Sequence, residues 1–382
     1  MSACDCTPTV SDLKPYEEAV ELLLSHAKPM RDTETLPLHD ALGRVLAQPV
    51  KSGIDVPGWD NSAMDGYAVR VADIAAEGTR LKISQRIPAG VAPQPLEPGT
   101  AARIFTGAPV PEGADAVVMQ ELTCQQDDDV IINTMPQPGA HIRRRGEDIR
   151  QDEEIILPGV RLLPQHLGLA ASVGVGALEV YRRPKVAVLA SGDELQMPGQ
   201  PLKPGMIYNS NIFTVAGMLR ALGCEVINLG QVEDTLEATK QALTKAASQS
   251  DLVVASGGVS VGEEDHVKPA VEALGELNMW KVAIRPGKPV AFGHIDDTSF
   301  IGTPGNPVSL FVTFLLFARP FIRKQAGLTE TMPTSIQATA GFDWNKPDKR
   351  REFHRARLEK QPDGSDLVSV HPSRSSAVLS ST

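Results

Sequence analysis

Cysteine is scarce in this chain, with 4 residues among 382. So few cysteines cannot form a disulfide scaffold for a protein of this size. Cys4 and Cys6 could bind a metal, but no second Cys/His pair has suitable spacing, and a plain tail is the preferred interpretation. The eight histidines are scattered and form no H-E-x-x-H pattern. We therefore expect a reduced, cytoplasmic protein.

Long apolar runs are also missing. The longest, residues 308–317, is interrupted by Thr313 and is too short to span a bilayer. The residues after Met1 are polar and acidic, unlike a secretory signal. The net charge of −10 argues against general nucleic-acid binding, which needs a basic face, although a small anion could still be held in a local basic pocket. We expect neither a membrane nor a nucleic acid as partner.

The length allows two or more domains. Apolar residues at helical spacing predict an amphipathic helix over 15–28, and a second helical segment is expected over 39–47. From 52 to 138, short apolar runs separated by proline and glycine turns indicate an all-β module. A helix beginning at Pro164 leads toward the next domain, and β-type segments return after Pro320.

Residues 180–325 alternate strands and helices, which predicts a doubly wound parallel α/β sheet. The expected strands are 185–190, 224–230, 251–256, 278–284 and 299–303. The expected helices are 211–222, 236–248, 266–274 and 307–317. Because the loops that follow parallel strands share one edge of a sheet, we expect the polar residues of these loops to form one site.

The loop Ser256-Gly257-Gly258-Val259-Ser260 follows an apolar strand. Its two glycines let backbone N–H groups approach a phosphate closely, and Ser260 can donate a further hydrogen bond. The alternative is a tight turn that needs glycine only for its dihedral angles. With its neighbours taken into account, phosphate binding is the preferred interpretation.

Three acids, Glu194, Asp234 and Asp265, follow strands of the same edge. Carboxylates around a phosphate are electrostatically unfavourable unless a cation intervenes, so the combination favours Mg²⁺ with oxygen ligands. Glu194 and Asp265 could each instead cap a helix N-terminus. Arg285 and Lys288 flank a rigid proline-glycine turn, where they would either bind an oxyanion or form a solvated basic turn.

Two polar clusters lie outside this region. Asp60 and Asp65 open the β module and could be ordinary turn residues. The run 143–148 sets three arginines beside Glu147 and Asp148, which alone is typical of a solvated, self-paired surface.

Seven segments together resemble one family, in its order and across almost the whole chain. They are DNSAMDGYAVR at 60–70, RIFTGAPVPEGADAVV at 103–118, RRRGEDI at 143–149, RPKVAVLASGDEL at 183–195, SGGVSVGEEDHVKP at 256–269, RPGKPVAFG at 285–293 and GTPGNPVSLF at 302–311. The family is that of the molybdopterin molybdenumtransferases, which includes bacterial MoeA proteins, the plant molybdenum insertase domain and the gephyrin E domain.

The resemblance implies transfer of molybdate to the dithiolene of adenylated molybdopterin, with release of AMP and a requirement for Mg²⁺. It also implies an elongated homodimer of four-domain chains, with an active site shared between subunits and contact with molybdopterin adenylyltransferase and later cofactor-processing proteins. The expected division is an elongated linking domain (1–53 and 139–178), an inserted β domain (54–138), an α/β molybdopterin-binding domain (179–326) and a small C-terminal β domain (327–382).

The family's functional acids match Asp60, Asp148, Glu194, Asp234 and Asp265. Asp60 and Asp148 are far from the sheet in sequence, so the resemblance implies that they reach it from the partner subunit. The molybdate-holding cations match Arg285 and Lys288. Further substrate contacts are expected from these residues: Ser256, Gly257, Gly258, Ser260, Pro304, Asn306, Arg355 and Ser376, with Ser375 as an alternative to Ser376.

The sequence departs from the family in two places. Members of the family usually continue past the serine-rich segment 374–380, so the resemblance implies a shortened last β domain, and GTPGNP replaces the frequent GLPGNP. Three other functions compete with this one: a receptor-clustering scaffold, an adenylating enzyme that consumes ATP, and a relative that is inactive or inserts tungstate. The acids and cations are all present, which disfavours loss of activity. Molybdate and tungstate have nearly the same size and charge, so both are candidate oxyanions.

Overall fold

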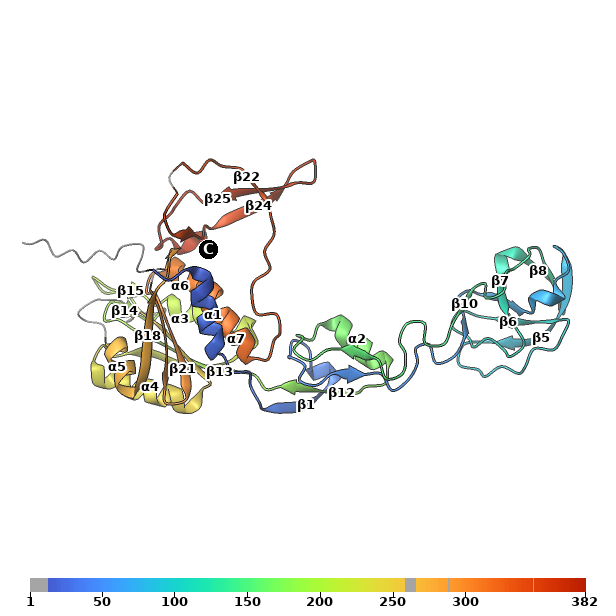
Figure 1. The fold of residues 1–382 in the computed structure, drawn as a ribbon, viewed down its shortest axis with the longest axis horizontal. Helices are drawn as coiled ribbons and strands as arrows, with labels where there is room; N and C mark the ends of the chain where they lie inside the picture. The colour runs from blue at the N-terminus through green and yellow to red at the C-terminus, as the bar shows by residue number, and fades with distance from the viewer. Residues whose placement is uncertain (1–12, 258–265, 288, 346) are drawn as a thin grey trace, which may run out of the picture.

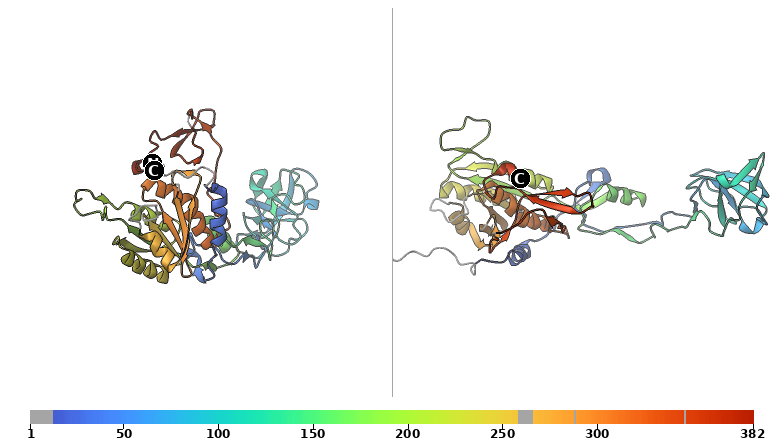
Figure 2. Two further views of the ribbon diagram at one scale, coloured as in Figure 1. Left: turned by 60° about the vertical axis from the view of Figure 1, so that its left-hand side comes forward. Right: turned by 90° about the horizontal axis from the view of Figure 1, so that it is seen from above.

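The computed structural model describes residues 13–257, 266–287, 289–345 and 347–382. The chain is elongated, with an α/β domain and a small C-terminal β domain at one end and a β module at the other (Figure 1). A narrow linking domain joins the two ends, and the view from above in Figure 2 keeps the β module apart from the rest. The expected multidomain combination of α/β and β parts is thus confirmed.

The α/β domain is built on a six-stranded sheet with the order β16-β13-β17-β21-β20-β18. Its strands are β13 (Lys185–Ser191), β16 (Glu225–Val232), β17 (Leu252–Ser256), β18 (Gly275–Lys281), β20 (Pro289–Ile295) and β21 (Thr298–Thr303). Strands β16, β13, β17 and β21 pair in parallel. Every residue of β17 is buried, as is usual for a central parallel strand covered on both faces.

The expectation of an entirely parallel sheet was wrong at one strand. β20, whose start lies in the proline-rich RPGKP segment, pairs antiparallel with both β21 and β18. Proline weakens the sequence signal of a strand, which is why this one was missed. Two successive antiparallel pairings restore the direction, so β18 runs the same way as β21. The loop after β18 therefore still reaches the edge at which the parallel strands end.

Helices cover both faces of this sheet (Figure 1). They are α3 (Asn211–Ala221), α4 (Leu236–Gln249), α5 (Val267–Leu274), α6 (Pro307–Thr313) and α7 (Arg319–Gln325), with a π-helical turn at Phe314–Ala318. Alternate residues of β13 enter two separate cores: Val186 and Val188 pack with α3 and α6, whereas Ala187 and Leu189 pack with α4 and α5.

The expected amphipathic helix near the N-terminus is α1 (Tyr16–His26), which buries Tyr16, Ala19, Val20 and Leu23. These residues join the core of α7 and the π-helical turn, where the Tyr16 and Phe317 rings meet edge to face at 5.8 Å. A fully buried Leu or Phe contributes roughly 1.5–3 kcal/mol. Burial of this face therefore fastens the start of the chain to the α/β domain.

The linking domain consists of two thin ribbons and one helix. Strand β1 (Thr33–Pro37) pairs with β12 (Ala177–Tyr181), and β2 (Val50–Lys51) pairs with β11 (Glu154–Ile156). Helix α2 (Pro164–Ser172) packs beside them. The helix expected over 39–47 is absent: a 3₁₀ turn at Leu38–Asp40 is followed by Gly43 at φ +76° and by bridge pairing of Val45 and Leu46. A left-handed glycine ends a helix, and extended backbone follows here.

The β module has the expected all-β character. Its sheet has the order β7-β4-β6-β5-β9-β8. The strands are β4 (Gly66–Val69), β5 (Thr79–Ile87), β6 (Thr100–Ile104), β7 (Ala116–Met119), β8 (Thr123–Gln126) and β9 (Asp129–Ile132), with 3₁₀ turns at Val71–Asp73 and Gln120–Leu122. At its base, β3 (Asn61–Ser62) pairs with β10 (Ile142–Arg143).

The C-terminal β domain contains β22 (Thr339–Ala340), β24 (Ala356–Lys360) and β25 (Asp366–Val370) in one sheet. Its strand β23 (Arg351–Glu352) pairs with β19 (Ile284–Arg285) of the α/β domain, which joins the two domains directly. Two short strands, β14 (Leu195–Gln196) and β15 (Ile207–Tyr208), and a final 3₁₀ turn at Leu379–Ser381 complete the elements. Among the described residues, no helix is long and apolar enough to cross a membrane.

Candidate active site

A cavity of about 1240 Å³ opens at the carboxyl edge of the six-stranded sheet. Its walls come from the loops after β13, β16, β17, β19 and β21, from the start of α3, and from the C-terminal β domain. A concave site at this edge is the usual ligand position in open α/β sheets. The convergence of these loops, expected from the positions of the glycine turns, is therefore present in the fold.

Gly257 lies at the cavity wall directly after β17 and has φ +82°. A Cβ atom there would stand 2.9 Å from the carbonyl oxygen of Ser191. The Gly257 N–H donates to the Thr303 carbonyl oxygen at 3.2 Å, which ties the loops after β17 and β21 together. Glycine is thus required both for the backbone angle and for the close approach of the neighbouring strand. Gly258 and Ser260 lie outside the described residues.

Two carboxylates, Glu194 and Asp234, line the same cavity. Asp234 accepts a hydrogen bond through Oδ1 from the Ser191 hydroxyl at 2.8 Å, which fixes one oxygen of the carboxylate. Asp265 lies outside the described residues. Among the residues that are described, no three His, Cys, Asp or Glu side chains come close enough to hold a metal ion.

Two asparagines that the sequence analysis did not select form another wall. Asn211, the first residue of α3, donates through Nδ2 to the Ser256 hydroxyl at 3.0 Å and to the Gly305 carbonyl oxygen at 2.7 Å. Asn209 is 1% exposed, and its Oδ1 accepts from the Ile212 N–H at 3.2 Å. That bond sets the orientation of the amide, and Asn209 Nδ2 is then buried without a hydrogen-bond partner among the described residues. A buried donor without a partner costs free energy, and this one belongs to a residue of the cavity wall.

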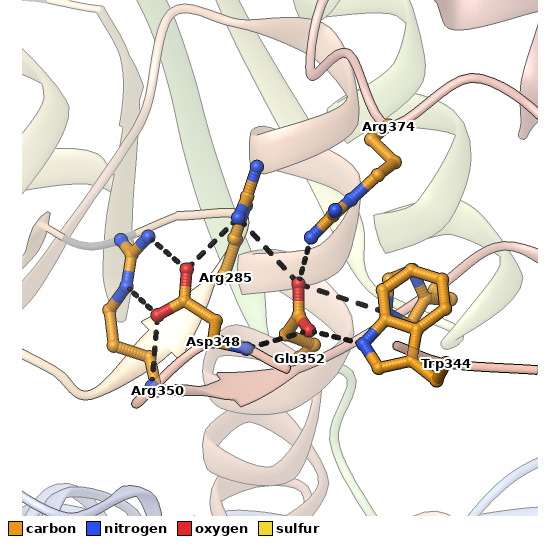
Figure 3. Close-up of polar contacts among 7 residues, drawn as sticks. Arg285, Trp344, Asp348, Arg350, Glu352 and Arg374 are labelled. Carbon is orange, nitrogen blue, oxygen red and sulfur yellow. Dashed lines mark hydrogen bonds and ion pairs between the residues drawn. The ribbon is translucent and has the colours of Figure 1, made fainter. Parts of the chain in front are cut away.

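Three arginines, Arg285, Arg350 and Arg374, line the cavity and converge on Asp348 and Glu352 (Figure 3). Arg285 Nη1 donates to Asp348 Oδ2 at 2.9 Å and lies 3.7 Å from Glu352 Oε1. Arg350 Nη2 donates to Asp348 at 2.9 Å, and Arg374 Nη2 donates to Glu352 at 2.6 Å. Three guanidinium groups against two carboxylates leave a net charge of one positive beside the cavity.

The tryptophan behind this cluster (Trp344) holds it in place. Trp344 Nε1 donates to Glu352 Oε2 at 2.9 Å, and the Arg374 guanidinium lies 4.7 Å from the Trp344 ring centre. Figure 3 shows Arg374 and Trp344 approaching Glu352 from different sides. A flat guanidinium stacks well on an aromatic face, so Arg374 is held by its charge and by its shape.

The two acids of the cluster stay ionised. Hydrogen bonds from Arg350, followed by that from Arg285, hold the pKa of Asp348 well below its usual range. Burial alone would raise the pKa of Glu352, but hydrogen bonds from the Asp348 backbone, Trp344 and Arg374 outweigh it, so that this pKa is lowered as well. Both carboxylates therefore orient the arginines throughout the neutral pH range.

The serine segment 373–381 closes one side of the cavity. The Ser376 carbonyl oxygen accepts from the Val308 N–H at 2.9 Å, in the first turn of α6. Arg355, expected as a substrate ligand, is not part of the cavity wall. It donates instead to the Ser373 carbonyl oxygen at 2.7 Å, to that of Ser375 at 3.2 Å and to the Ser381 hydroxyl at 2.9 Å. The geometry therefore gives Arg355 the task of holding this segment.

The fold brings many of the expected residues together. Those lining the cavity are Glu194, Asp234, Ser256, Gly257, Arg285, Pro304, Asn306 and Ser376. Gly258, Ser260, Asp265 and Lys288 lie outside the described residues. The residues that sequence reasoning missed are Asn209, Asn211, Arg350 and Arg374. Of these, only the asparagines had a local signal in the sequence: the run Asn209-Ser210-Asn211 is typical of the start of a helix, here α3.

Asp60 and Asp148 do not reach the cavity within one chain. Asp60 stands at the base of the β module, where it accepts from Arg144 Nη1 at 2.6 Å and from the Arg145 N–H at 2.8 Å. Burial raises its pKa, but these two bonds lower it by more. The Asp148 N–H pairs with the Val56 carbonyl oxygen in the same region. Figure 1 shows that the full linking domain separates this region, near β10, from the α/β domain.

Comparison with known proteins gives matches along the chain. Three family models match: "MoeA N-terminal region (domain I and II)" over 14–174, "Probable molybdopterin binding domain" over 187–324, and "MoeA C-terminal region (domain IV)" over 337–382. A protein of Haemophilus influenzae named molybdopterin molybdenumtransferase is 44% identical over 326 residues, which are 85% of this chain and 80% of that protein. One of the same name from Bacillus subtilis is 35% identical and covers 96% of this chain and 87% of its own length.

Solved structures agree with these sequence matches. The crystal structure of a molybdopterin biosynthesis MoeA protein from Pyrococcus horikoshii OT3 superposes with a TM-score of 0.82 at 30% identity and covers 97% of this chain and 92% of its own. A second structure of a MoeA protein from Pyrococcus horikoshii gives a TM-score of 0.76 at 33% identity, covering 94% and 90%. The likeness extends over all parts of the fold.

Proposed function

Because the chain belongs to the family of molybdopterin molybdenumtransferases, and is thus a transferase of molybdenum cofactor biosynthesis, we propose that it inserts molybdate into adenylated molybdopterin with release of AMP. One observation carries the proposal. A glycine turn suited to phosphate, two carboxylates and an arginine cluster with excess positive charge face the same cavity. That combination suits a substrate with a phosphate linkage together with a separate oxyanion.

The glycine turn and the asparagine wall would receive the organic substrate. Gly257, together with Gly258 and Ser260, would offer backbone and hydroxyl donors to its phosphates. Asn211 ties Ser256, at the end of β17, to the loop at Gly305, so these two parts of the wall are joined before the substrate binds. Pro304 and Asn306 line the same side of the cavity and would contact this substrate as well.

The arginine cluster would receive molybdate. Arg285, Arg350 and Arg374 offer planar, charged donors that match a tetrahedral oxyanion, and Lys288 would add a fourth cation. Ser376 lines the cavity beside them. Because Asp348 and Glu352 fix the guanidinium groups in advance, little side-chain entropy is lost when the oxyanion binds.

Magnesium fits the acids on the other side of the cavity. The Asp234 and Glu194 oxygens are hard ligands of the kind that Mg²⁺ prefers, and Asp265 would complete the set. When bound, the ion would neutralise the phosphate charge. Ser191 keeps one Asp234 oxygen in a fixed position through its hydrogen bond.

Cleavage would follow from positioning and neutralisation of charge, as in other phosphoryl transfers. In one route, an oxygen of molybdate would attack the adenylate phosphorus, and the bond from that phosphorus to the pterin phosphate oxygen would break. AMP would then be bonded to molybdate through oxygen, and it would leave when the dithiolene sulfurs displace it from molybdenum. In the other route, a water admitted once molybdate is in place would attack the same phosphorus, which releases AMP and the pterin phosphate directly and passes the proton of the water to solvent. The cations would stabilise charge on the oxyanion, while the glycine turn keeps the phosphate in line.

A homodimer is part of the proposal, because Asp60 and Asp148 are remote from the cavity of their own chain. They would act at the cavity of the partner subunit. The proposed division is 1–53 with 139–178 for the linking domain, 54–138 for the β module, 179–326 for the α/β domain and 327–382 for the C-terminal β domain, with one correction. Helix α1 (Tyr16–His26) packs in the core of the α/β domain and so belongs to that domain. The substrate would come from molybdopterin adenylyltransferase, and the product would pass to later cofactor-processing proteins.

The test is to incubate the purified protein with adenylated molybdopterin, Mg²⁺ and molybdate and to measure the AMP released. Molybdate-dependent AMP release without ATP is expected. Consumption of ATP would point instead to an adenylating enzyme, and a folded dimer that releases no AMP but binds receptor peptides would point to a scaffold. Either result would refute the proposal.

A further inference from the structure

Three arginine side chains, Arg161, Arg319 and Arg323, meet where the linking domain joins the α/β domain; they are called the junction arginines below. Arg319 and Arg323 are four residues apart on α7 and so share one face of that helix. Arg161 belongs to the linking domain, where it bridges to Val45, and its Nη2 reaches the Ala221 carbonyl oxygen at the end of α3 at 3.5 Å. Figure 1 draws α7 on the side of the α/β domain from which the linking domain leaves.

The backbone on both sides of the junction is tied together. The Thr329 N–H, just after α7, donates to the Gly159 carbonyl oxygen at 3.1 Å. A Cβ atom at Gly159 would stand 2.6 Å from the Thr329 side chain, so the two segments are in close contact. The junction arginines are therefore held near one another by packing and not by a counter-ion.

The described residues place no carboxylate in direct contact with these three charges. Among the described residues, none of the junction arginines takes part in an ion pair within 4.0 Å. Arg323 donates only to the Glu330 carbonyl oxygen, at 2.9 Å from Nε and 2.6 Å from Nη2. Arg319 Nη1 is buried and has no hydrogen-bond partner among those residues.

The pKa of Arg323 shows the same imbalance. Burial lowers it first, and the charges of Arg319 and Arg161 lower it further, opposed only by the exposed Glu330. Half-buried like charges repel, and a buried guanidinium donor without an acceptor costs free energy. The arginine cluster at the cavity contrasts with this one, because two ionised acids hold the guanidinium groups there.

We propose that the junction arginines form a second anion site, which binds a phosphate-type oxyanion between the linking domain and the α/β domain. Guanidinium groups present planar pairs of donors that match the oxygens of phosphate. All three side chains are half-buried and thus remain open to solvent on one side. An anion on that open side would offset the like charge of the three guanidinium groups and bridge the two domains.

This site is separate from the substrate cavity. Gln325, at the end of α7, donates to the carbonyl oxygen of Asp251, which directly precedes β17. The cavity lies at the other end of β17, at Ser256 and Gly257. The two sites therefore lie toward opposite edges of the sheet, and the junction site would set the angle of the linking domain and leave the chemistry of the cavity unchanged.

The test measures inorganic phosphate bound to the full-length protein by equilibrium dialysis with labelled phosphate. The variants are Arg319→Gln and Arg161→Gln, which alter the two domains separately. The matched control is Arg357→Gln, which removes an exposed arginine without a described partner on β24. Each junction variant is expected to bind one phosphate fewer per chain than the wild type, or to bind it at least tenfold more weakly. The control and the AMP-releasing activity should remain unchanged.

Equal phosphate binding by the wild type and both junction variants would overturn the proposal, as would an equal loss in the Arg357→Gln control. A third outcome would also overturn it: no extra phosphate on the wild type, with a dimer that dissociates more readily in Arg319→Gln. That result would mean that carboxylates of a second copy supply the counter-charge. Should Arg319→Gln fail to fold, Arg161→Gln gives the same readout from the other domain.

Discussion

Replacement of Arg374 by glutamine tests whether the arginine cluster binds the oxyanion. The change removes one of three cations and leaves Glu352 without its 2.6 Å partner. The net charge beside the cavity falls from one positive to zero. A hydrogen bond to a charged group contributes about 1.5–3 kcal/mol, and because Arg374 is 38% exposed, the lower end of that range applies. A loss of about 1.5 kcal/mol corresponds to roughly a tenfold higher molybdate concentration for half-maximal rate.

The assay is AMP release as a function of molybdate, with adenylated molybdopterin saturating. Arg374→Gln should raise the half-saturating molybdate concentration and leave the maximal rate within about threefold, because the phosphate-binding wall is intact. Arg374→Lys should lie between the two, since lysine keeps the charge but loses the stack on Trp344. Arg357→Gln serves as the control for loss of one arginine. An unchanged molybdate dependence in a folded Arg374→Gln protein would refute the assignment of this cluster.

Three further predictions concern the same cavity and its supports. Asn209→Asp keeps the acceptor for the backbone N–H of Ile212 but replaces the buried donor by a carboxylate oxygen at a position that is 1% exposed, so the thermal midpoint should fall, and kcat/KM for the pterin should fall about tenfold, for a loss of about 1–2 kcal/mol; unchanged kinetics would exclude a role of this amide in pterin binding. Arg355→Ala releases the segment that carries Ser376 and should increase proteolysis there as well as the molybdate requirement, whereas a direct ligand would change only the latter. Asp348 and Glu352 have lowered pKa values in the folded state, so their stabilisation is complete above the ordinary carboxylate pKa and is lost as the pH falls through the folded values. Urea unfolding should therefore show stability decreasing below about pH 4, and a smaller decrease in Glu352→Gln.

The part of the site that follows from strand ends could be predicted from the sequence. Glu194, Ser256, Gly257 and Pro304 each stand directly after or close to an apolar strand, and parallel strands bring such positions together. Arg285 was predicted to lie at this edge although the antiparallel strand β20 was not foreseen. The prediction holds because β18, which precedes Arg285, runs in the same direction as the parallel strands.

The rest depended on long-range folding that no local pattern encodes. Arg350 and Arg374 reach the cavity because the C-terminal β domain folds back and β23 pairs with β19, far away in sequence. Asn209 stands out only in the folded structure, where its Nδ2 is buried without a hydrogen-bond partner among the described residues. Arg355 was expected as a ligand from its motif alone, whereas only the structure shows that its guanidinium turns toward the serine segment.

The pairing of β3 with β10 makes the β module an inserted unit whose two ends lie side by side. The chain goes out and returns through neighbouring strands, with Ser62 opposite Ile142 and Asn61 opposite Arg143. The chain enters and leaves the β module through this one pair of strands. The module therefore adds no strand to the ribbons of the linking domain or to the six-stranded sheet. A short turn that joined β3 directly to β10 would replace the module without altering any strand of the α/β domain. The same geometry separates the length of the β module from the structure of the α/β domain, because both ends of the module leave the linking domain at one pair of neighbouring strands.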